Sequence, residues 1–346
     1  MRIEEQVLAP LDRCYAASRL FFNNEYCPVF ASEGEGPCYL FSGKHYEVKN
    51  TIWEKPGGTM SLIEIPWRKG EFLAVQNFKR NFEAQDACVV HGRPSAAGGW
   101  EVTPLLQLPY LHRFDLLERN GQYYFLGATL CSSKREREDW SDPGKIYVGA
   151  LSPDLDRPVA LAVLKDGLTK NHGYAHVVWH GQQTGLVAAH EGIFAVSPPS
   201  AHGLDWNIEQ LTDTPTSDVA AIDLDGDGEL ELVTISPFHG SDFRVLKQIY
   251  HRWECVYTYP VQNDFYHVVK SCILAGRPMV LGGCRRGQKQ LFAIAYNRDT
   301  QQYESILIDE EVGPSNVDVI PGSSCDIIVS ANREIGVCTL YYVYAD

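Results

Sequence analysis

Six histidines of this chain stand at the boundaries of short apolar segments, where their imidazole groups could act together. They are His112, His172, His176, His190, His239 and His267. Imidazole binds borderline divalent cations such as Mn, Zn, Ni or Fe. It also transfers protons near neutral pH. These residue types therefore indicate a transition-metal site, an acid–base site, or both.

A second group of candidate ligands is acidic. Asp223, Asp225 and Asp227 alternate with Leu and Gly, and Glu231 follows them. Alternating carboxylates around a glycine turn bind a hard cation such as Ca or Mg. The flanking segments, Val-Ala-Ala-Ile and Leu-Val-Thr-Ile, predict strands rather than EF-hand helices. We expect a structural Ca or Mg site in this hairpin, the alternative being an acidic turn without metal.

The elements that must position these groups form a faint repeat of about 50 residues. Short β-rich segments alternate with Gly, Asn, Asp and Pro turns, without sustained helical periodicity. Seven copies align, which predicts an all-β fold, a seven-bladed β-propeller that spans residues 1–346 as a single domain. A six-bladed ring is the alternative, in which the segment from Cys14 to Gly43 is an accessory hairpin.

The two ends of the chain complement each other in this repeat. The last copy ends after its third strand, while the segment from Arg2 to Leu8 belongs to no copy. We expect the N-terminal strand to complete the last blade, because such closure removes two exposed sheet edges.

The repeat also predicts where the histidines meet. In a propeller, the first strand of each blade starts on the face where the second strand ends. The first-strand set is His112, His176 and His267, with His172 in the loop before His176, and the second-strand set is His190 and His239. We expect all six at one mouth of the channel, beside Arg113 and Arg285. Alternatively, polar first-strand residues hydrogen-bond neighbouring blades.

The acidic motif within residues 218–240, with its flanking strands, resembles the calcium-binding loop of FG-GAP/VCBS propeller blades. Among enzymes of this architecture, the chain is most similar to the propeller dehydratase domain of aldos-2-ulose dehydratase. It resembles more distantly the metal-dependent propeller lyases that act on uronic-acid sugars. This resemblance implies a divalent metal held by histidines, and a nearby base that starts β-elimination.

The resemblance also implies roles for single residues. It makes His112, His176 and His267 candidate metal ligands. It gives His190 and His239 the role of ligand or base, and it pairs Arg113 and Arg285 with an anionic or enolate oxygen. With His172, which lies in the loop before His176, these are the candidate catalytic residues.

The activity expected from this resemblance is that of a carbon–oxygen lyase acting on a keto sugar or glycoside. The alternative is a non-catalytic propeller that binds a glycan or a protein and is stabilised by Ca or Mg. A lactonase or phosphatase ranks third, because it would need carboxylate-rich metal ligation.

The amino-acid composition argues against two classes of binding partner. The formal net charge of the 346 residues is −14 and no Lys/Arg run occurs, so nucleic acid and anionic membranes are poor partners. No apolar leader or long apolar stretch is present, which predicts a cytoplasmic protein with reduced cysteines. We expect a small sugar or glycoside as substrate, and oligomerisation stays open.

The charged segment from Cys131 to Gly144 is either a lid or a solvated loop.

Overall fold

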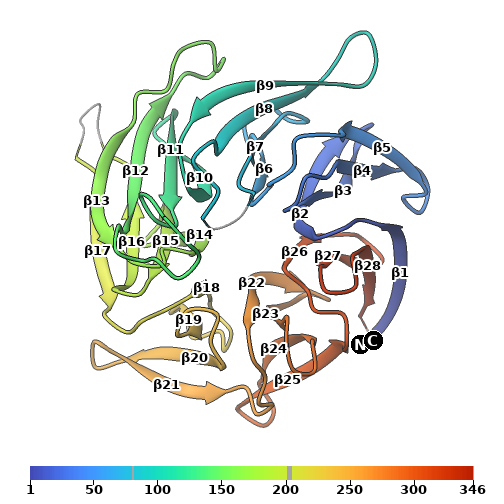
Figure 1. Ribbon diagram of the computed structural model, residues 1–346. Helices are drawn as coiled ribbons and strands as arrows, with labels where there is room; N and C mark the ends of the chain where they lie inside the picture. Colours follow the sequence, from blue (N-terminus) through green and yellow to red (C-terminus); the bar gives the residue numbers. More distant parts are fainter. Residues whose placement is uncertain (80–81, 201–204, 346) are drawn as a thin grey trace.

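The computed structural model describes residues 1–79, 82–200 and 205–345. These residues form strands and turns but no helix, and thus none that is long and apolar enough to cross a membrane. The strands make seven antiparallel four-stranded sheets, arranged as blades round a central axis (Figure 1). The prediction of an all-β, seven-bladed propeller is confirmed.

The first strand of each blade faces the axis, and the second strand pairs with it. The first strands are β2 (Cys14–Phe22), β6 (Leu62–Glu64), β10 (Leu111–Arg119), β14 (Gly173–Trp179), β18 (Asp218–Ile222), β22 (Tyr266–Leu274) and β26 (Asn316–Ile320). The second strands are β3 (Glu25–Ser32), β7 (Phe72–Gln76), β11 (Gln122–Thr129), β15 (Gln182–Ala189), β19 (Glu231–Ser236), β23 (Arg277–Cys284) and β27 (Asp326–Asn332).

The third and fourth strands continue each blade outward. The third strands are β4 (Cys38–Ser42), β8 (Cys88–Pro94), β12 (Gly144–Leu151), β16 (Gly192–Ser197), β20 (Asp242–Ile249), β24 (Leu291–Asn297) and β28 (Val337–Tyr344). The outer strands are β5 (Val48–Trp53), β9 (Trp100–Gln107), β13 (Ala162–Leu168), β17 (Asn207–Thr212), β21 (Arg252–Thr258), β25 (Gln302–Asp309) and β1 (Arg2–Pro10).

The last blade is closed by the two ends of the chain. Strand β1 pairs antiparallel with β28, from Arg2 opposite Tyr344 to Pro10 opposite Val337. The two termini therefore lie side by side in Figure 1. The segment after Cys14 forms the complete blade β2–β5, so the six-bladed alternative is wrong.

The core lies between adjacent blades rather than at the axis. Leu20, Val29 and Leu40 of the first blade, for example, belong to one buried cluster with Phe72 and Val90 of the next. The second strands are buried along most of their length, which explains their nearly continuous apolar sequences. Because each blade is held by its neighbours, the residues at the starts of the inner strands have fixed positions around the axis.

Candidate metal centre at one mouth of the channel

Each blade contributes one residue to a ring at one mouth, at or just before the start of its inner strand. In blade order, the ring consists of Tyr15, Met60, His112, His172, Ser217, His267 and Ser315. Three members of the ring are thus histidines, and all three are buried.

A local irregularity turns three of these side chains toward the axis. In β2, β10 and β22, the pairing with the next strand shifts by one residue at Tyr15, His112 and His267. Each shift is a β-bulge, which re-aims the extra side chain. In all three cases the residue two positions earlier, just before the strand begins, has a left-handed backbone, as at Tyr110 with a φ of 58°. The same device therefore recurs in three blades.

Each ring histidine binds the backbone of the following blade through the same nitrogen. The Nδ1 atom of His112 lies 3.3 Å from the carbonyl oxygen of His172, and that of His172 lies 3.2 Å from the carbonyl of Ser217. The Nδ1 atom of His267 lies 2.6 Å from the carbonyl of Ser315. Because a carbonyl only accepts, Nδ1 carries the proton, and each Nε2 presents a lone pair that can accept a hydrogen bond or bind an ion.

The surroundings keep these imidazoles neutral. Burial, followed by the positive charge of Arg113, lowers the pKa of His172 to about 3. Burial is also the main cause that lowers the pKa of His112, His239 and His267 well below the ordinary value. A neutral imidazole with a free Nε2 is the form that binds a metal ion.

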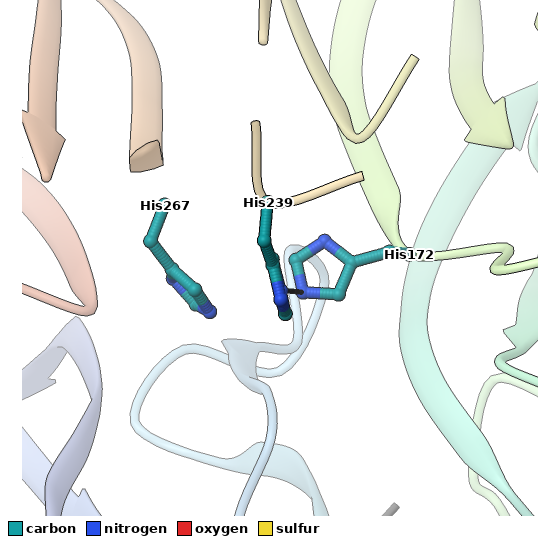
Figure 2. A group of neighbouring side chains, drawn as sticks. All are labelled: His172, His239 and His267. Atoms are coloured by element: carbon teal, nitrogen blue, oxygen red, sulfur yellow. Dashed lines mark hydrogen bonds between the residues drawn. The ribbon is translucent and has the colours of Figure 1, made fainter. Parts of the chain in front are cut away.

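A fourth histidine reaches this group from the loop between β19 and β20. The Nε2 atom of His239 lies 3.2 Å from that of His172, and Figure 2 shows their rings close to that of His267. Two nitrogen ligands of one ion, at bond lengths of about 2.0–2.2 Å, lie about 3.0–3.4 Å apart. One ligand atom from each of His172, His239 and His267 lies within 4.8 Å of the others. Three imidazole nitrogens are a donor set of the kind that binds a borderline divalent cation.

Tyr15 completes the group and was not singled out from the sequence. Its buried hydroxyl lies 3.5 Å from Nε2 of His112 and 3.3 Å from Nε2 of His267. Burial is the main cause that raises the pKa of this phenol, so it stays protonated and can donate to one nitrogen at a time. The signal available in the sequence was its position, because Tyr15 occupies the place in its repeat that His112 occupies in another.

The floor below the ring carries one fixed positive charge and one buried carboxyl group. The guanidinium of Arg113 donates to the carbonyl of Met60 and to Oδ1 of Asn316, both at 3.0 Å. Asp218 lines the same part of the channel, and its burial raises its pKa to about 7 although the charge of Arg113 lowers it. Arg113 thus lines the channel together with His267 and Asp218, and the catalytic role expected for it stays a prediction.

A cavity of about 430 Å³ opens above this group. Its walls include the four histidines His112, His172, His239 and His267, the hydroxyl-bearing Tyr15, and the rings of Phe78, Phe238 and Phe265. Arg285 also lines it and forms an ion pair with Glu334 at 2.8 Å. The cavity falls within the size range of small-ligand sites.

His176 does not belong to this mouth, which corrects the predicted ligand set. It lies four residues further along β14 than His172, and an extended strand advances about 3.3 Å per residue. His176 lines a separate cavity of about 660 Å³ toward the other end of the channel. Its Nδ1 donates to Oδ2 of Asp115 in the neighbouring blade at 2.6 Å. Burial lowers its pKa, but the hydrogen bond and the charge of Asp115 outweigh burial and raise it.

His190 is likewise not brought to the group. Only His190 and Glu191 separate β15 from β16, which makes a tight turn, and the side chain of His190 is exposed. His239 reaches the cavity because β19 and β20 are joined by the longer segment 237–241. His190 and His239 hold equivalent places at the ends of second strands, but the loops that follow differ in length. Only the longer loop brings its histidine to the cavity.

The acidic hairpin lies at the opposite face from the histidines, since it follows the far end of β18. Carboxylate oxygens of Asp223, Asp225 and Asp227 come within 4.8 Å of one another, so they could hold a metal ion. The ammonium group of Lys247, on β20, already forms ion pairs with Asp225, with Asp227 at 2.8 Å and with Glu231 at 3.3 Å. A cation predicted for this loop would therefore share these carboxylates with the ammonium group of Lys247.

The segment after Cys131 packs against the wall of the cavity. Trp140 contacts Phe238 edge to face, with ring centroids 5.4 Å apart, and Phe238 stacks on His239 at 4.0 Å. The ammonium group of Lys134 lies 3.3 Å from the centre of the Trp140 ring and donates to the carbonyl of Arg137 at 2.6 Å. Arg137 itself lines the cavity. This loop is thus part of the candidate site.

No family model and no curated protein matches the sequence. Solved structures with the same fold include the virginiamycin B lyase of Staphylococcus aureus, with a TM-score of 0.59, 11% identity, and coverage of 100% of this chain and 99% of that one. They also include the periplasmic gluconolactonase of Pseudomonas aeruginosa, with a TM-score of 0.57, 15% identity, and coverage of 91% and 94%.

By name these two neighbours are a lyase and a lactonase, and at such identities the likeness shows the fold alone. The resemblance to FG-GAP/VCBS blades and to aldos-2-ulose dehydratase is not confirmed by these comparisons and stays a prediction.

Proposed function

We propose that the protein is a metal-dependent carbon–oxygen lyase that carries out β-elimination on an oxidised sugar bound in the mouth cavity. The observation that carries this proposal is the orientation of the ring histidines. Each donates Nδ1–H to the next blade's backbone and turns an unprotonated Nε2 toward its neighbours. Blade-to-blade bonding alone would not require a fourth histidine, His239, from a separate loop.

His172, His239 and His267 would hold the ion, because their nitrogen atoms form the compact group. When bound, a divalent ion supplies Lewis acidity, which polarises a carbonyl or carboxyl oxygen of the substrate and acidifies the neighbouring C–H bond. The guanidinium of Arg113, fixed by Met60 and Asn316, adds positive charge beneath the oxygen on which negative charge develops.

β-Elimination also needs a base for the carbon-bound proton and an acid for the departing oxygen. We assign the base to Nε2 of His112, which carries no proton, belongs to a neutral imidazole and lies outside the three-histidine group. We assign the acid to the hydroxyl of Tyr15, which stays protonated and lies 3.5 Å from that nitrogen. After elimination the proton can return from His112 to Tyr15, since the two groups are neighbours.

The test compares elimination by the metal-loaded wild-type protein with that of Tyr15→Phe. A panel of keto sugars and oxidised glycosides is screened for the ultraviolet absorbance of an unsaturated carbonyl product. We expect metal-dependent product formation that falls about 100-fold in Tyr15→Phe, with metal content unchanged. His190→Ala, at the exposed turn, is the matched control and should keep full activity.

Two outcomes would contradict the proposal. One is product formation that does not depend on metal. The other is a protein that binds metal and sugar but exchanges no carbon-bound proton with deuterated solvent, which would instead favour the non-catalytic binding propeller.

A further inference from the structure

The far end of the channel contains a cavity that the proposed function does not use. Its volume is about 660 Å³, within the size range of small-ligand sites. All seven inner strands contribute residues to its wall. This far-end cavity therefore belongs to the channel itself and is not a crevice between two blades.

A buried carboxylate holds the ring of His176 at the far-end cavity. Oδ2 of Asp115 accepts from Nδ1 of His176 at 2.6 Å and from the hydroxyl of Tyr174 at 2.7 Å. Its Oδ1 accepts from the backbone amide of Leu116 at 2.7 Å. The imidazole is half-exposed, and its Nε2 has no partner in the described part of the chain. Because Nδ1 is bound to the carboxylate, Nε2 is the atom that can bind a ligand.

The charged form of this imidazole presents a hydrogen-bond donor. Burial lowers the pKa of His176, but the hydrogen bond to Asp115 and the charge of Asp115 outweigh burial and raise it. An imidazolium carries a proton on both nitrogens, so Nε2 can donate to an anion. Lys270, which also lines the cavity, lies 3.5 Å from Oδ1 of Asp318. That pair is partly exposed, and the ammonium keeps donors for a ligand.

Two further cations of the wall are held in place by neutral groups. The guanidinium of Arg19 donates to the carbonyl of Val319. The ammonium of Lys69 lies 3.4 Å from the centre of the Phe21 ring. The guanidinium carbon of Arg19 and the ammonium of Lys69 each lie 5.4 Å from the centre of the Tyr26 ring. No carboxylate among the described residues neutralises either charge.

Three carboxylates also line the far-end cavity, and each is bound by the protein itself. Asp115 and Asp318 are paired as described above. The third, Glu64, accepts at Oε1 from the backbone amides of Phe21 and Gly70, at 3.0 and 2.9 Å. The carboxylates are therefore engaged, whereas the cations keep donors that a ligand can use. This balance favours an oxyanion in the cavity.

We propose that the far-end cavity is a second ligand site that binds a phosphate group, with the imidazolium of His176 as its fixed donor. Arg19, Lys69 and Lys270 supply the positive charge around it. Phosphate suits this arrangement, because its oxygens accept strong hydrogen bonds from several directions and its charge approaches −2 near neutral pH. Asp115 is a positioning residue, since it acts through the ring of His176. The site uses no residue of the metal centre and so goes beyond the proposed function.

The test measures binding to the full chain by isothermal titration calorimetry with three probes, inorganic phosphate, glycerol 3-phosphate and glycerol. We expect both phosphates to bind, with an affinity that falls as NaCl is raised, and glycerol not to bind. Tighter binding of glycerol 3-phosphate would identify the ligand as a phosphorylated metabolite, and tighter binding of inorganic phosphate would identify it as free phosphate.

Two substitutions test the donors. His176→Gln and Lys69→Gln should each weaken the binding of glycerol 3-phosphate about three- to tenfold. His190→Gln is the matched control for the first, because His190 is an exposed histidine of the same blade at the other face. Lys44→Gln is the control for the second, since Lys44 is exposed in the turn between β4 and β5 and does not line this cavity.

Nitrogen NMR of the histidine side chains locates the ligand in the wild type, so this result does not depend on the folding of a variant. Adding glycerol 3-phosphate should shift the signal of Nε2 of His176 and leave that of His190 unchanged. Three results would overturn the inference: no phosphate binding, variants that bind like their controls, or shifts confined to the mouth histidines.

The two proposals fail separately. Phosphate binding through His176 in a protein that holds no transition metal would support this inference and remove the proposed lyase function. Metal-dependent elimination in a protein that binds no phosphate at the far end would do the reverse.

Discussion

Each ring histidine uses its two nitrogens differently. Nδ1 donates to the backbone of the next blade, and Nε2 is left without a proton in a buried place. A buried imidazole in this state loses stability if it must become charged. The same histidines that could bind a metal ion therefore also make the stability of the fold sensitive to acid.

We expect the metal-free protein to lose stability as the pH falls below about 6.5, the ordinary pKa of histidine. Below this pH the histidines of the unfolded chain bind protons, whereas four histidines stay neutral in the folded state, namely His112, His172, His239 and His267. The free energy of unfolding therefore decreases as the pH is lowered. For His172 the loss continues to about pH 3. Asp218, whose pKa is raised to about 7, acts in the opposite direction for one proton between about pH 4 and 7.

Urea unfolding of wild type and His172→Gln at pH 7.5 and 5.5 isolates the contribution of His172 to the pH dependence of stability. The wild type should lose more stability, with a difference of up to about 1.4 kcal/mol per pH unit below pH 6.5. His190→Gln, at an exposed position, should behave as the wild type. The same pH dependence in wild type and His172→Gln would show that His172 does not stay neutral in the fold.

At the scale of elements, the strands could be predicted from the sequence but their irregularities could not. The alternation of apolar segments and turns placed the blades, and third strands such as Gly192–Ser197 were found where expected. The bulges at Tyr15, His112 and His267 left no signal in the repeat, because a bulge shifts pairing and not composition. His176 was misplaced by a register error of four residues in the aligned repeat: β14 starts at Gly173, so the position equivalent to His112 in this blade is His172.

The acidic hairpin shows the same limit of prediction from the sequence. Its carboxylates could be predicted to converge, whereas Lys247 comes from another strand whose register the sequence does not fix. In the fold, three carboxylates of the hairpin bind this one ammonium group.

We expect Lys247→Met to increase the stabilisation of the protein by calcium. Removing the ammonium leaves Asp225, Asp227 and the buried Glu231 without their counter-charge, and a divalent ion can replace it. The melting temperature is measured with and without millimolar CaCl₂ in both proteins. The shift on adding calcium should be larger in the variant by several degrees.

Lys289→Met removes a lysine that pairs with Glu311 at the surface, at 3.3 Å, and serves as the control. A calcium shift that is the same in wild type, Lys247→Met and Lys289→Met would mean that the hairpin binds no calcium in either state.

At the scale of the whole molecule, the ring depends on its closure. Strand β1 covers the edge of β28 along nearly its whole length. It also adds Ile3 and Leu8 to the apolar clusters on either side of the last blade. A ring without it would expose a long free strand edge, which promotes association.

We therefore expect a chain that lacks residues 1–10 to melt at a temperature lower by at least about 5 °C. It should also associate in a concentration-dependent manner, as judged by light scattering. A synthetic peptide of residues 1–10, added in excess, should restore the melting temperature by pairing with β28, while a scrambled peptide should not. A truncated chain that stays monomeric and melts like the full chain would contradict this role of β1.

The most direct test of the histidine site is the metal content of protein purified without a His-tag or chelator, measured by mass spectrometry. Wild type is compared with His172→Ala, His239→Ala and His267→Ala, and His190→Ala is the matched control. We expect about one equivalent of Mn, Zn, Ni or Fe in wild type and His190→Ala, and its loss from each of the other three. A wild type without transition metal, or a content that none of the three substitutions lowers, would contradict a metal centre at this mouth.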